Sequence, residues 1–316
     1  MIIQNSGKSY ENGRSMNQSL TFEILSYEMK KRSIEFGSAQ MRTLKLTGED
    51  GLYTNLAYLL SDQCETTTKV ALFQGTDKAV FRDRKEFTGS VLKQLEDVYQ
   101  FIDLNNKTKA VFSGLNRLDM RDYPEEAVRE ALLNCTAHRD YSFSGSSLIN
   151  IYDDRMEYVS PGGLVPGLEL KSIFLGVSQS RNPNLAAVLY RMRLIESYGT
   201  GIGKIQRMYY GAEGQPKFET AKGVFRVTLP NCNEMNVYMA AQIQEQTGTT
   251  GVGSLLEKQK DMIAAYALEN GRVTRREAEE LLEAGTTKAF RLLKELCDEG
   301  RLKTEGNGKL CRYVPG

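Results

Sequence analysis

Three polar residues repeat at four-residue spacing behind Pro124: Glu130, Asn134 and His138, the last being the only histidine in the chain. In a helix this spacing places the three side chains on one face. A carboxylate can polarise water, a carboxamide oxygen can ligate a hard cation such as Mg²⁺, and the imidazole, with the guanidinium of Arg139, can meet phosphate. The pattern indicates a nucleotide-handling site. A solvated helix face that happens to include a histidine is the alternative.

A second set of candidate residues lies in the segment 199–204, Gly-Thr-Gly-Ile-Gly-Lys. Gly199, Gly201 and Gly203, with Lys204 beside them, would let backbone N–H groups approach a phosphate at the N-terminus of the helix that follows. The segment matches neither the P-loop pattern nor the dinucleotide-binding pattern. A helix C-cap followed by a tight turn is the alternative explanation.

The elements that must position these residues follow from periodicity and turn residues. Residues 147–159 predict two strands joined at Asp153-Asp154, because apolar and polar residues alternate on both sides of this turn. The next residues, 160–164, have the sequence Ser-Pro-Gly-Gly-Leu, which predicts a turn that ends the hairpin. A β-hairpin therefore follows the polar helix along the chain.

Further elements surround this hairpin. Asn182 followed by proline predicts an N-cap and the first helical position, and the apolar spacing continues as a helix to near Ile195. Residues 69–75 and 79–87 have the pattern of strands, and residues 91–103 that of an amphipathic helix. The fold class expected is α+β.

The order of these elements resembles that of the GHKL (Bergerat-fold) ATPases: a helix with an ExxxN motif, a hairpin, a glycine-rich turn, a second helix and a GxGxG loop. More closely, EALLNCTAHRDYS, DDRMEYVSPGGL, SQSRNP and ESYGTGIGKI resemble the divergent GHKL-like domain known as the RecG-related C-terminal domain. That domain occurs in predicted transcriptional regulators, which often begin with a Schlafen-like AlbA domain. The resemblance covers residues 66–230 and is strongest over 124–205.

The resemblance implies a GHKL-like two-layer sandwich and a role for each matched residue. Glu130 would be the catalytic general base or water-positioning group, and Asn134 the ligand of Mg²⁺. ATP or another nucleotide with Mg²⁺ would be the cofactor. The candidate nucleotide-binding residues are Asn134, His138, Arg139, Ser160, Gly162, Gly163, Gly199, Gly201, Gly203 and Lys204.

The chain departs from the family pattern at Ser160. The family has an adenine-reading aspartate there, and a hydroxyl is a weaker acceptor than a carboxylate, so adenine specificity is not implied. The sequence also lacks a Walker A motif and therefore a recognisable helicase motor.

The C-terminal part predicts a different module. Ser254 with Glu257, and Thr274 with Glu277, have capping-box spacing, so each pair would open a helix. A third helix is expected over 286–299, with Phe290, Leu293 and Leu296 in the core, and a hairpin with an EGNG turn follows. This order resembles a winged helix-turn-helix. Its use would be DNA binding, with the third helix in the major groove, or else dimerisation. The candidate DNA-binding residues are Lys288, Arg291, Lys294, Lys303, Lys309 and Arg312.

Composition indicates the class of protein, and stretches rich in turn-forming residues indicate where its parts begin and end. The net charge is +1 at pH 7, and the five cysteines lack CxxC spacing, which favours reduced packing residues over a disulfide framework or a zinc site. No long apolar run or hydrophobic leader is present, so a cytoplasmic protein without a membrane partner is expected. The expected parts are a helical N-terminal segment at 1–65, the GHKL-like domain at 66–230, a linker at 231–253 and the winged helix at 254–316. Residues 1–65 resemble the exit from an AlbA domain, which suggests truncation at Met1 or loss of that module.

The function expected is that of a DNA-binding transcriptional regulator with a degenerate GHKL-like nucleotide-sensing domain. Its partners would be double-stranded DNA and a second copy of the chain, because a winged helix reading a pseudo-palindrome needs two copies. A slow Mg-dependent ATPase targeted by the winged helix is one alternative. A scaffold whose GHKL-like domain has lost its ligand is the other.

Overall fold

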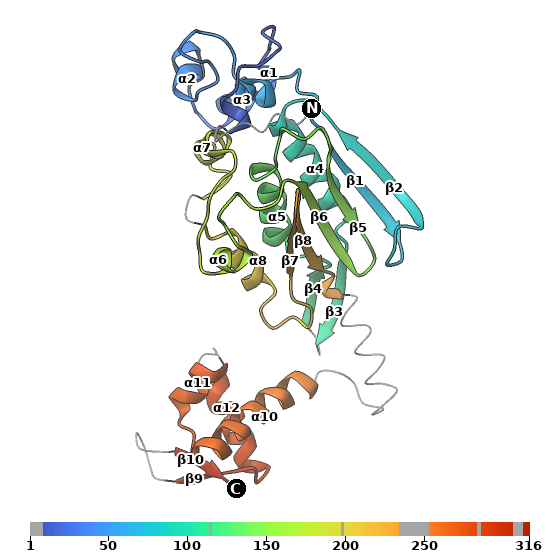
Figure 1. The fold of residues 1–316 in the computed structure, drawn as a ribbon. Helices are drawn as coiled ribbons and strands as arrows, with labels where there is room; N and C mark the ends of the chain where they lie inside the picture. The colour runs from blue at the N-terminus through green and yellow to red at the C-terminus, as the bar shows by residue number, and fades with distance from the viewer. Residues whose placement is uncertain (1–8, 114–115, 197–198, 234–252, 283–285, 306–311) are drawn as a thin grey trace. The chain divides into compact units, whose positions relative to one another are not determined.

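The computed structural model describes residues 9–113, 116–196, 199–233, 253–282, 286–305 and 312–316. The chain divides into two compact units, Met1–Val237 and Tyr238–Gly316 (Figure 1). Among the described residues, no helix combines the length and the apolar character that crossing a membrane requires.

The described N-terminal part of the first unit contains short helices joined by irregular segments. A 3₁₀ helix, η1 (Tyr10–Asn12), is followed by α1 (Glu23–Lys31), α2 (Ser38–Thr43) and α3 (Asn55–Leu60). Leu25 and Met29 are the fully buried residues of α1, whereas Tyr27 is 63% exposed.

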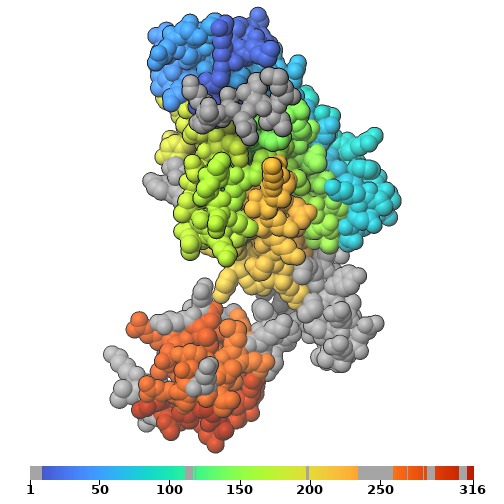
Figure 2. All heavy atoms as spheres, viewed as in Figure 1, coloured from blue at the N-terminus to red at the C-terminus, as the bar shows by residue number. Residues whose placement is uncertain are grey.

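A six-stranded sheet forms the centre of the first unit. Its strand order is β2-β1-β5-β6-β8-β7, with β1 and β5 parallel and all other pairs antiparallel. The strands are β1 (Thr68–Gln74), β2 (Val80–Phe87), β5 (Ser147–Ile151), β6 (Arg155–Pro161), β7 (Lys217–Ala221) and β8 (Val224–Pro230). Strand β2 is an edge strand that is exposed along nearly its whole length and forms the cyan rim in Figure 2.

The sequence predicts part of this sheet. Strands β1 and β2 and the β5–β6 hairpin lie where expected, but β6 continues through Ser160 and Pro161, so the turn begins later than predicted. Strands β7 and β8 were not predicted. Neither was the separate two-stranded sheet of β3 (Thr108–Ser113) and β4 (Asn116–Arg121).

Two helices pack on the sheet because their apolar stripes match its buried face. Helix α4 (Val91–Asn105) contacts β1 and β2, and α5 (Glu125–Ala137) contacts β6 and β8. Ile149 and Met156 are fully buried beneath them. One hydrophobic core extends from Leu20 in the N-terminal part to Leu229 in β8, so the N-terminal helices and the sheet share a single core.

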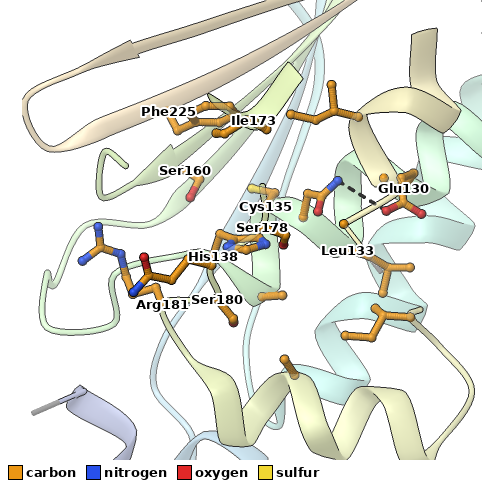
Figure 3. A pocket seen from close by; sticks show the side chains of 18 of the residues that line it. Glu130, Leu133, Cys135, His138, Ser160, Ile173, Ser178, Ser180, Arg181 and Phe225 are labelled. Carbon is orange, nitrogen blue, oxygen red and sulfur yellow. Dashed lines mark hydrogen bonds between the residues drawn. The ribbon is translucent and has the colours of Figure 1, made fainter. Parts of the chain in front are cut away.

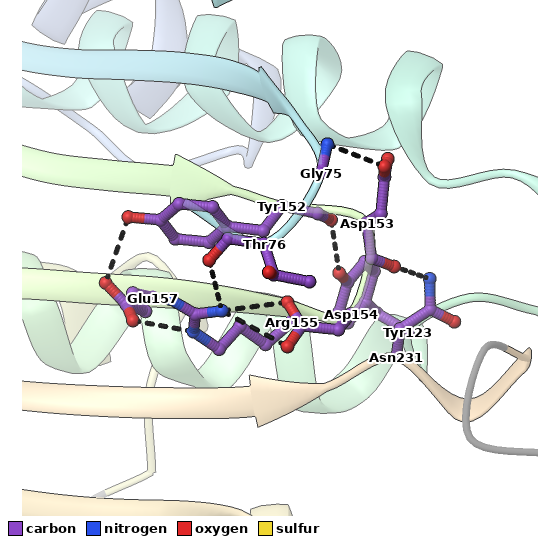
Figure 4. Close-up of polar contacts among 9 residues, drawn as sticks. All are labelled: Gly75, Thr76, Tyr123, Tyr152, Asp153, Asp154, Arg155, Glu157 and Asn231. Atoms are coloured by element: carbon purple, nitrogen blue, oxygen red, sulfur yellow. Dashed lines mark hydrogen bonds and ion pairs between the residues drawn. The ribbon is translucent and has the colours of Figure 1, made fainter. Parts of the chain in front are cut away.

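The turn of the β5–β6 hairpin is fixed by polar contacts (Figure 4). The carboxylate of Asp153 accepts a hydrogen bond from Gly75 N at 2.7 Å, which ties this turn to the β1–β2 turn. The guanidinium of Arg155 bonds Glu157 Oε1 at 2.8 Å and lies over the ring of Tyr152. Asn231, just beyond β8, donates to Asp153 O at 2.9 Å. These contacts tie together the two turns and the residues that follow β8 at this end of the sheet.

Three helices complete the first unit. They are α6 (Leu170–Phe174), α7 (Pro183–Arg191) and α8 (Gly201–Met208). Helix α7 begins at the predicted proline but ends at Arg191, before the predicted Ile195, and Arg193 then has a positive φ of 57°. The glycine-rich segment does not form a long loop, because Gly201 and Gly203 both lie in the first turn of α8.

The second unit contains α10 (Gly253–Asn270), α11 (Arg275–Leu282) and α12 (Thr286–Asp298), followed by an antiparallel pair of strands, β9 (Leu302–Glu305) and β10 (Arg312–Pro315). The reciprocal capping box is present: Glu277 N donates to Thr274 Oγ1 at 3.3 Å, and Thr274 N donates to Glu277 Oε2 at 2.7 Å.

Two expectations for this unit are wrong. Phe290 is not in the core but 43% exposed, because Ala289, Leu292, Leu293 and Leu296 form the buried stripe of α12. Ser254 lies within α10 rather than before it. The side chains of Ser254 and Glu257 and the EGNG turn beyond Glu305 lie outside the described residues.

Candidate functional site

The first unit contains a cavity of about 490 Å³ between α5, β6, α7, α8 and the segment 162–182. This volume lies within the range of small-molecule sites in proteins, roughly 300 to 1,000 Å³. Figure 3 shows Glu130 at one end of the cavity, Ser160 and Arg181 at the other, and His138 between them.

The acidic end is formed by α5 and α8. Glu130 and Asn134 are adjacent on α5, and Asn134 Nδ2 lies 3.4 Å from Glu130 Oε1, a long hydrogen bond (Figure 3). Burial raises the pKa of Glu130, while the positive charge of Lys204 opposes this shift. Lys204 also lines the cavity, with Nζ 2.6 Å from Glu196 Oε1. The predicted carboxylate, carboxamide and lysine are thus brought together.

Gly201 is required by this arrangement. A Cβ at this position would lie 2.3 Å from Glu130 Oε1 and 3.0 Å from Asn134 Nδ2, so any side chain would displace the pair. Gly199 has a φ of +66°, and a Cβ there would lie 2.9 Å from Ser178 Cβ. Gly203 does not contribute as expected: it is exposed on α8, does not line the cavity, and a Cβ there would meet nothing within 4 Å.

The other glycine box is formed by residues that follow β6. Gly162 and Gly163 line the cavity, but each is packed against protein. A Cβ on Gly162 would lie 2.6 Å from Asp140 Cβ, and one on Gly163 would lie 2.7 Å from Ala221 O. These glycines therefore permit close packing of the cavity wall. Ser160 is 4% exposed at the same end of the cavity.

His138 lines the cavity although it lies just beyond the last helical residue, Ala137. Burial, with the nearby positive charge of Arg181, lowers the pKa of His138. The imidazole is therefore neutral at pH 7 and offers one donor and one acceptor rather than a positive charge. It does not supply the cationic phosphate contact that its sequence position suggested.

Arg139 does not belong to the site, contrary to the prediction. Its guanidinium points away from the cavity and donates to Thr67 O at 2.9 Å and Gly145 O at 2.8 Å. The arginine that lines the cavity is Arg181, which pairs with Asp140 Oδ2 at 3.1 Å and donates to Gly163 O at 2.8 Å. The SQSRNP motif was the signal that could have identified it.

Sequence reasoning also missed the apolar walls of the cavity, because their residues carry no chemical signature. The sulfur of Cys135 forms part of the floor, and burial raises the pKa of this thiol to about 11, so it is neutral and unreactive. Ser180 Oγ is buried without a hydrogen-bond partner among the described residues. The apolar residues that line the cavity include Leu133, Leu164, Ile173, Val177, Tyr190 and Phe225.

The residues at the acidic end fit a magnesium ion carried by a nucleotide. Asn134 Oδ1 accepts no hydrogen bond from a described residue and remains available to a hard cation. Mg²⁺ typically takes one or two protein oxygens, with water and substrate phosphates as its other ligands. No group of three or more His, Cys, Asp or Glu side chains is placed to hold a metal within the described parts of the chain.

The candidate DNA-binding residues of the second unit that the structure describes are all exposed. They are Arg291, Lys294, Lys303 and Arg312. Arg291 lies 3.7 Å from Glu295, a surface pair that constrains it little. The exposed Arg275 of α11 lies over the ring of Phe290 and adds a cation that sequence reasoning missed. The side chain of Lys288, and all of Lys309, lie outside the described residues.

Comparison with solved structures and curated proteins gives limited matches. The crystal structure of the DIP2311 protein from Corynebacterium diphtheriae is similar, with a TM-score of 0.62 and 17% sequence identity over 99% of this chain and 65% of that one. This likeness concerns the fold alone, and the chain spans about 65% of the length of that protein. No curated protein sequence matches the chain.

A family model gives the more specific result. Residues 146–229 match the family described as "putative ATP-dependent DNA helicase recG C-terminal". The matched residues include the β5–β6 hairpin, α7, α8 and the β7–β8 pair, but not the helix that carries Glu130 and Asn134. The chain therefore contains an ATPase-like, RecG-related domain.

Proposed function

We propose that this chain is a cytoplasmic, DNA-binding transcriptional regulator whose ATPase-like domain senses a nucleotide. The observation that carries the proposal is the cavity, which brings Glu130, Asn134, Gly201 and Lys204 together at one end. The family match over residues 146–229, which does not include Glu130 or Asn134, supports nucleotide binding independently of those two side chains.

The two ends of the cavity suit different parts of a nucleotide. At the α8 end, Lys204 and the backbone N–H groups that begin the helix would bind phosphate, and Asn134 would ligate Mg²⁺. The bound ion would neutralise phosphate charge next to the carboxylate of Glu130. At the other end, the apolar wall with Ser160 and the neutral His138 would take a base. Because a hydroxyl is a weaker acceptor than a carboxylate, Ser160 would not select adenine strongly over other bases.

Thermal unfolding of the full chain with Mg-ATP, Mg-ADP and Mg-GTP tests nucleotide binding. A nucleotide at 100 times its dissociation constant should stabilise the fold by about 2.7 kcal/mol. The shift should disappear in Asn134→Ala and persist in Asn105→Ala, an asparagine that does not line the cavity. No shift at millimolar nucleotide, or equal shifts in both variants, would contradict the proposal.

The second unit is proposed to be a winged helix that binds double-stranded DNA. Three helices followed by an antiparallel pair of strands is the order this domain requires, with α12 in the major groove and β9–β10 along the backbone. The exposed cations of α12 and the strands support this use. We further propose a homodimer, which light scattering of the full chain tests. A monomer at tens of micromolar, both with and without duplex DNA, would contradict it.

Slow Mg-dependent ATP hydrolysis is a second candidate function. Glu130 favours it, because a carboxylate whose pKa is raised by burial accepts a proton from water more readily than an ordinary glutamate does. In that case the second unit would direct the activity to DNA.

A further inference from the structure

A fully buried carboxylate from the N-terminal segment caps helix α7. Glu11 is 0% exposed, and its two oxygens accept hydrogen bonds from Asn184 N at 2.7 Å and Leu185 N at 2.8 Å. These are N–H groups of the first helical turn, which have no partner within the helix. The positive end of the helix dipole also favours a negative charge at this position.

The residue that should cap α7 from its own sequence does not do so. Asn182 occupies the N-cap position, but its side chain makes no capping bond and donates instead to Ala137 O at 3.0 Å and Arg139 O at 2.7 Å. The first turn of α7 therefore depends on Glu11.

Two further contacts attach the N-terminal segment 9–12 to the start of α7. Ser9 Oγ donates to Arg181 O at 3.0 Å, and Asn184 Nδ2 donates to Asn12 Oδ1 at 2.6 Å. Figure 1 shows α7 next to the N-terminal helices. Arg32, the residue that follows the last helical residue of α1, also donates from Nε to Met192 O at 3.1 Å, just beyond the end of α7.

The helix held in this way is one wall of the cavity. Pro183, Ala186, Ala187 and Tyr190 of α7 line it, and so does the segment 177–181 that leads into the helix. Glu11 itself does not line the cavity. A change at Glu11 would therefore reach a ligand only through the position of this wall.

We propose that Glu11 is a positioning residue for the cavity, so that docking of the N-terminal segment 9–12 and ligand binding in the cavity are thermodynamically coupled. This coupling rests on the proposed function, because it requires that the cavity binds a ligand. Coupling between two sites is reciprocal: whatever factor the docked segment adds to ligand affinity, the bound ligand adds to docking of the segment.

Hydrogen exchange of the full chain, with Glu11→Gln as the variant, tests the positioning role without ligand. Glutamine keeps the shape of the side chain but faces two N–H donors with only one acceptor. Exchange over α7 should become about 2- to 30-fold faster, the range that loss of an N-cap produces. Glu35→Gln, a change of an exposed glutamate in the same part of the chain, should have no effect. Unchanged exchange over α7, or equal acceleration of β5 and β6, would overturn the proposal.

Binding of Mg-ADP tests the coupling itself. Its dissociation constant should rise by a factor in the same range in Glu11→Gln and stay unchanged in Glu35→Gln. In the wild type, Mg-ADP should slow exchange at residues 9–13. If the wild type binds but neither effect occurs, the coupling is wrong. If the wild type binds no nucleotide, the proposed function fails, and the ligand-free exchange over α7 still decides whether Glu11 holds the wall.

Discussion

At the scale of single residues, the charge state of Glu130 depends on opposing influences. Burial disfavours its ionised form and raises the pKa, whereas Lys204 and Arg129 favour ionisation and lower it. Burial is the larger effect. Ionisation of Glu130 therefore costs more free energy in the folded protein than in the unfolded chain, and this difference can be measured by changing pH.

We expect a pH-dependent difference in stability between the wild type and Glu130→Gln. Because the folded-state pKa is raised, the favourable contribution of Glu130 is fully present below its ordinary value of 4.5 and is lost as pH rises through the raised pKa. As pH rises above about 4.5, the free energy of unfolding of the wild type should therefore fall relative to that of Glu130→Gln, until the raised pKa of Glu130 is passed. Urea unfolding at several pH values measures this. A difference that moves the other way would show that the positive charges prevail.

If the chain hydrolyses ATP, the same substitution should remove the activity and leave binding intact. Glutamine cannot accept a proton from water, and loss of general-base catalysis costs about 100- to 10,000-fold in rate. Single-turnover phosphate release measures the rate, and thermal shift with Mg-ADP measures binding. Glu126→Gln, which changes an exposed glutamate of the same helix that does not line the cavity, is the control. Equal rates in the wild type and Glu130→Gln would assign any hydrolysis to another group.

Two glycines of α8 that are separated by a single residue, Gly201 and Gly203, give opposite expectations. In Gly201→Ala the new Cβ would collide with the Glu130 carboxylate, and such overpacking typically costs 1 to 3 kcal/mol. In Gly203→Ala the Cβ enters open space, and replacing glycine by alanine in a helix stabilises it by about 1 kcal/mol. Melting temperatures with and without Mg-ADP check both. The first variant should lose stability and the nucleotide shift, whereas the second should gain stability and keep the nucleotide shift. A nucleotide shift that survives in Gly201→Ala would contradict this account of the site.

At the scale of elements, the sequence predicts those with regular periodicity. The β5–β6 hairpin, α4 and the helix that carries Glu130 lie close to their expected positions. Strands β3 and β4 were not predicted because their polar and apolar residues do not alternate cleanly and they pair only with each other. The five-residue α6 is too short for a helical period to be recognised.

The site shows the same limit. Spacing along one helix predicts that Glu130 and Asn134 are neighbours, but it cannot show that the chain turns after Ala137 and directs Arg139 away from the cavity. Helix α7 is a second example, since its first residue was predicted correctly from Pro183 while its cap lies 173 residues away in sequence, at Glu11. Contacts between distant segments leave no local pattern to read.

The capping box of α11 is an element-scale prediction that can be tested directly. Thr274→Ala removes the acceptor for Glu277 N, and loss of an N-cap costs about 1 kcal/mol. Hydrogen exchange over α11 should therefore accelerate by roughly fivefold. Thr304→Ala, at an exposed position in β9, should leave this exchange unchanged. Exchange that is equal in the two variants would mean that packing of Ala278 and Leu282, rather than the cap, holds the start of the helix.

At the scale of the whole molecule, the two units have separate cores. The core of the first unit extends from Leu20 to Leu229, and the core of the second from Ile263 to Tyr313. Each unit can therefore be perturbed at its surface without changing the core of the other. Substitutions of exposed cations in the second unit should alter DNA binding and leave the nucleotide shift of the first unit unchanged, which separates the regulator from a protein that uses its second unit only for assembly.

The DNA contacts make the sharpest whole-molecule prediction. Arg291 is exposed on α12, where a bidentate contact to guanine would contribute about 1 to 3 kcal/mol of discrimination. Lys303 is exposed on β9, where a point charge would meet phosphate without reading sequence if the second unit binds DNA. Arg291→Ala should therefore relax sequence preference, and Lys303→Ala should weaken binding to all duplexes and lower the salt slope by about one.

Binding of the full chain to a randomised duplex pool and to single duplexes, at two or more salt concentrations, distinguishes these effects. Asp298→Ala, which removes an exposed acid from the end of α12, is the matched control and should not reduce affinity. Contacts with DNA phosphates release counterions whatever the base sequence. If β9 and β10 contact the DNA backbone, the salt dependence of the affinity will therefore show it with any duplex. If the full chain does not bind duplex DNA at low salt, the second unit is an assembly module and the regulator proposal is wrong.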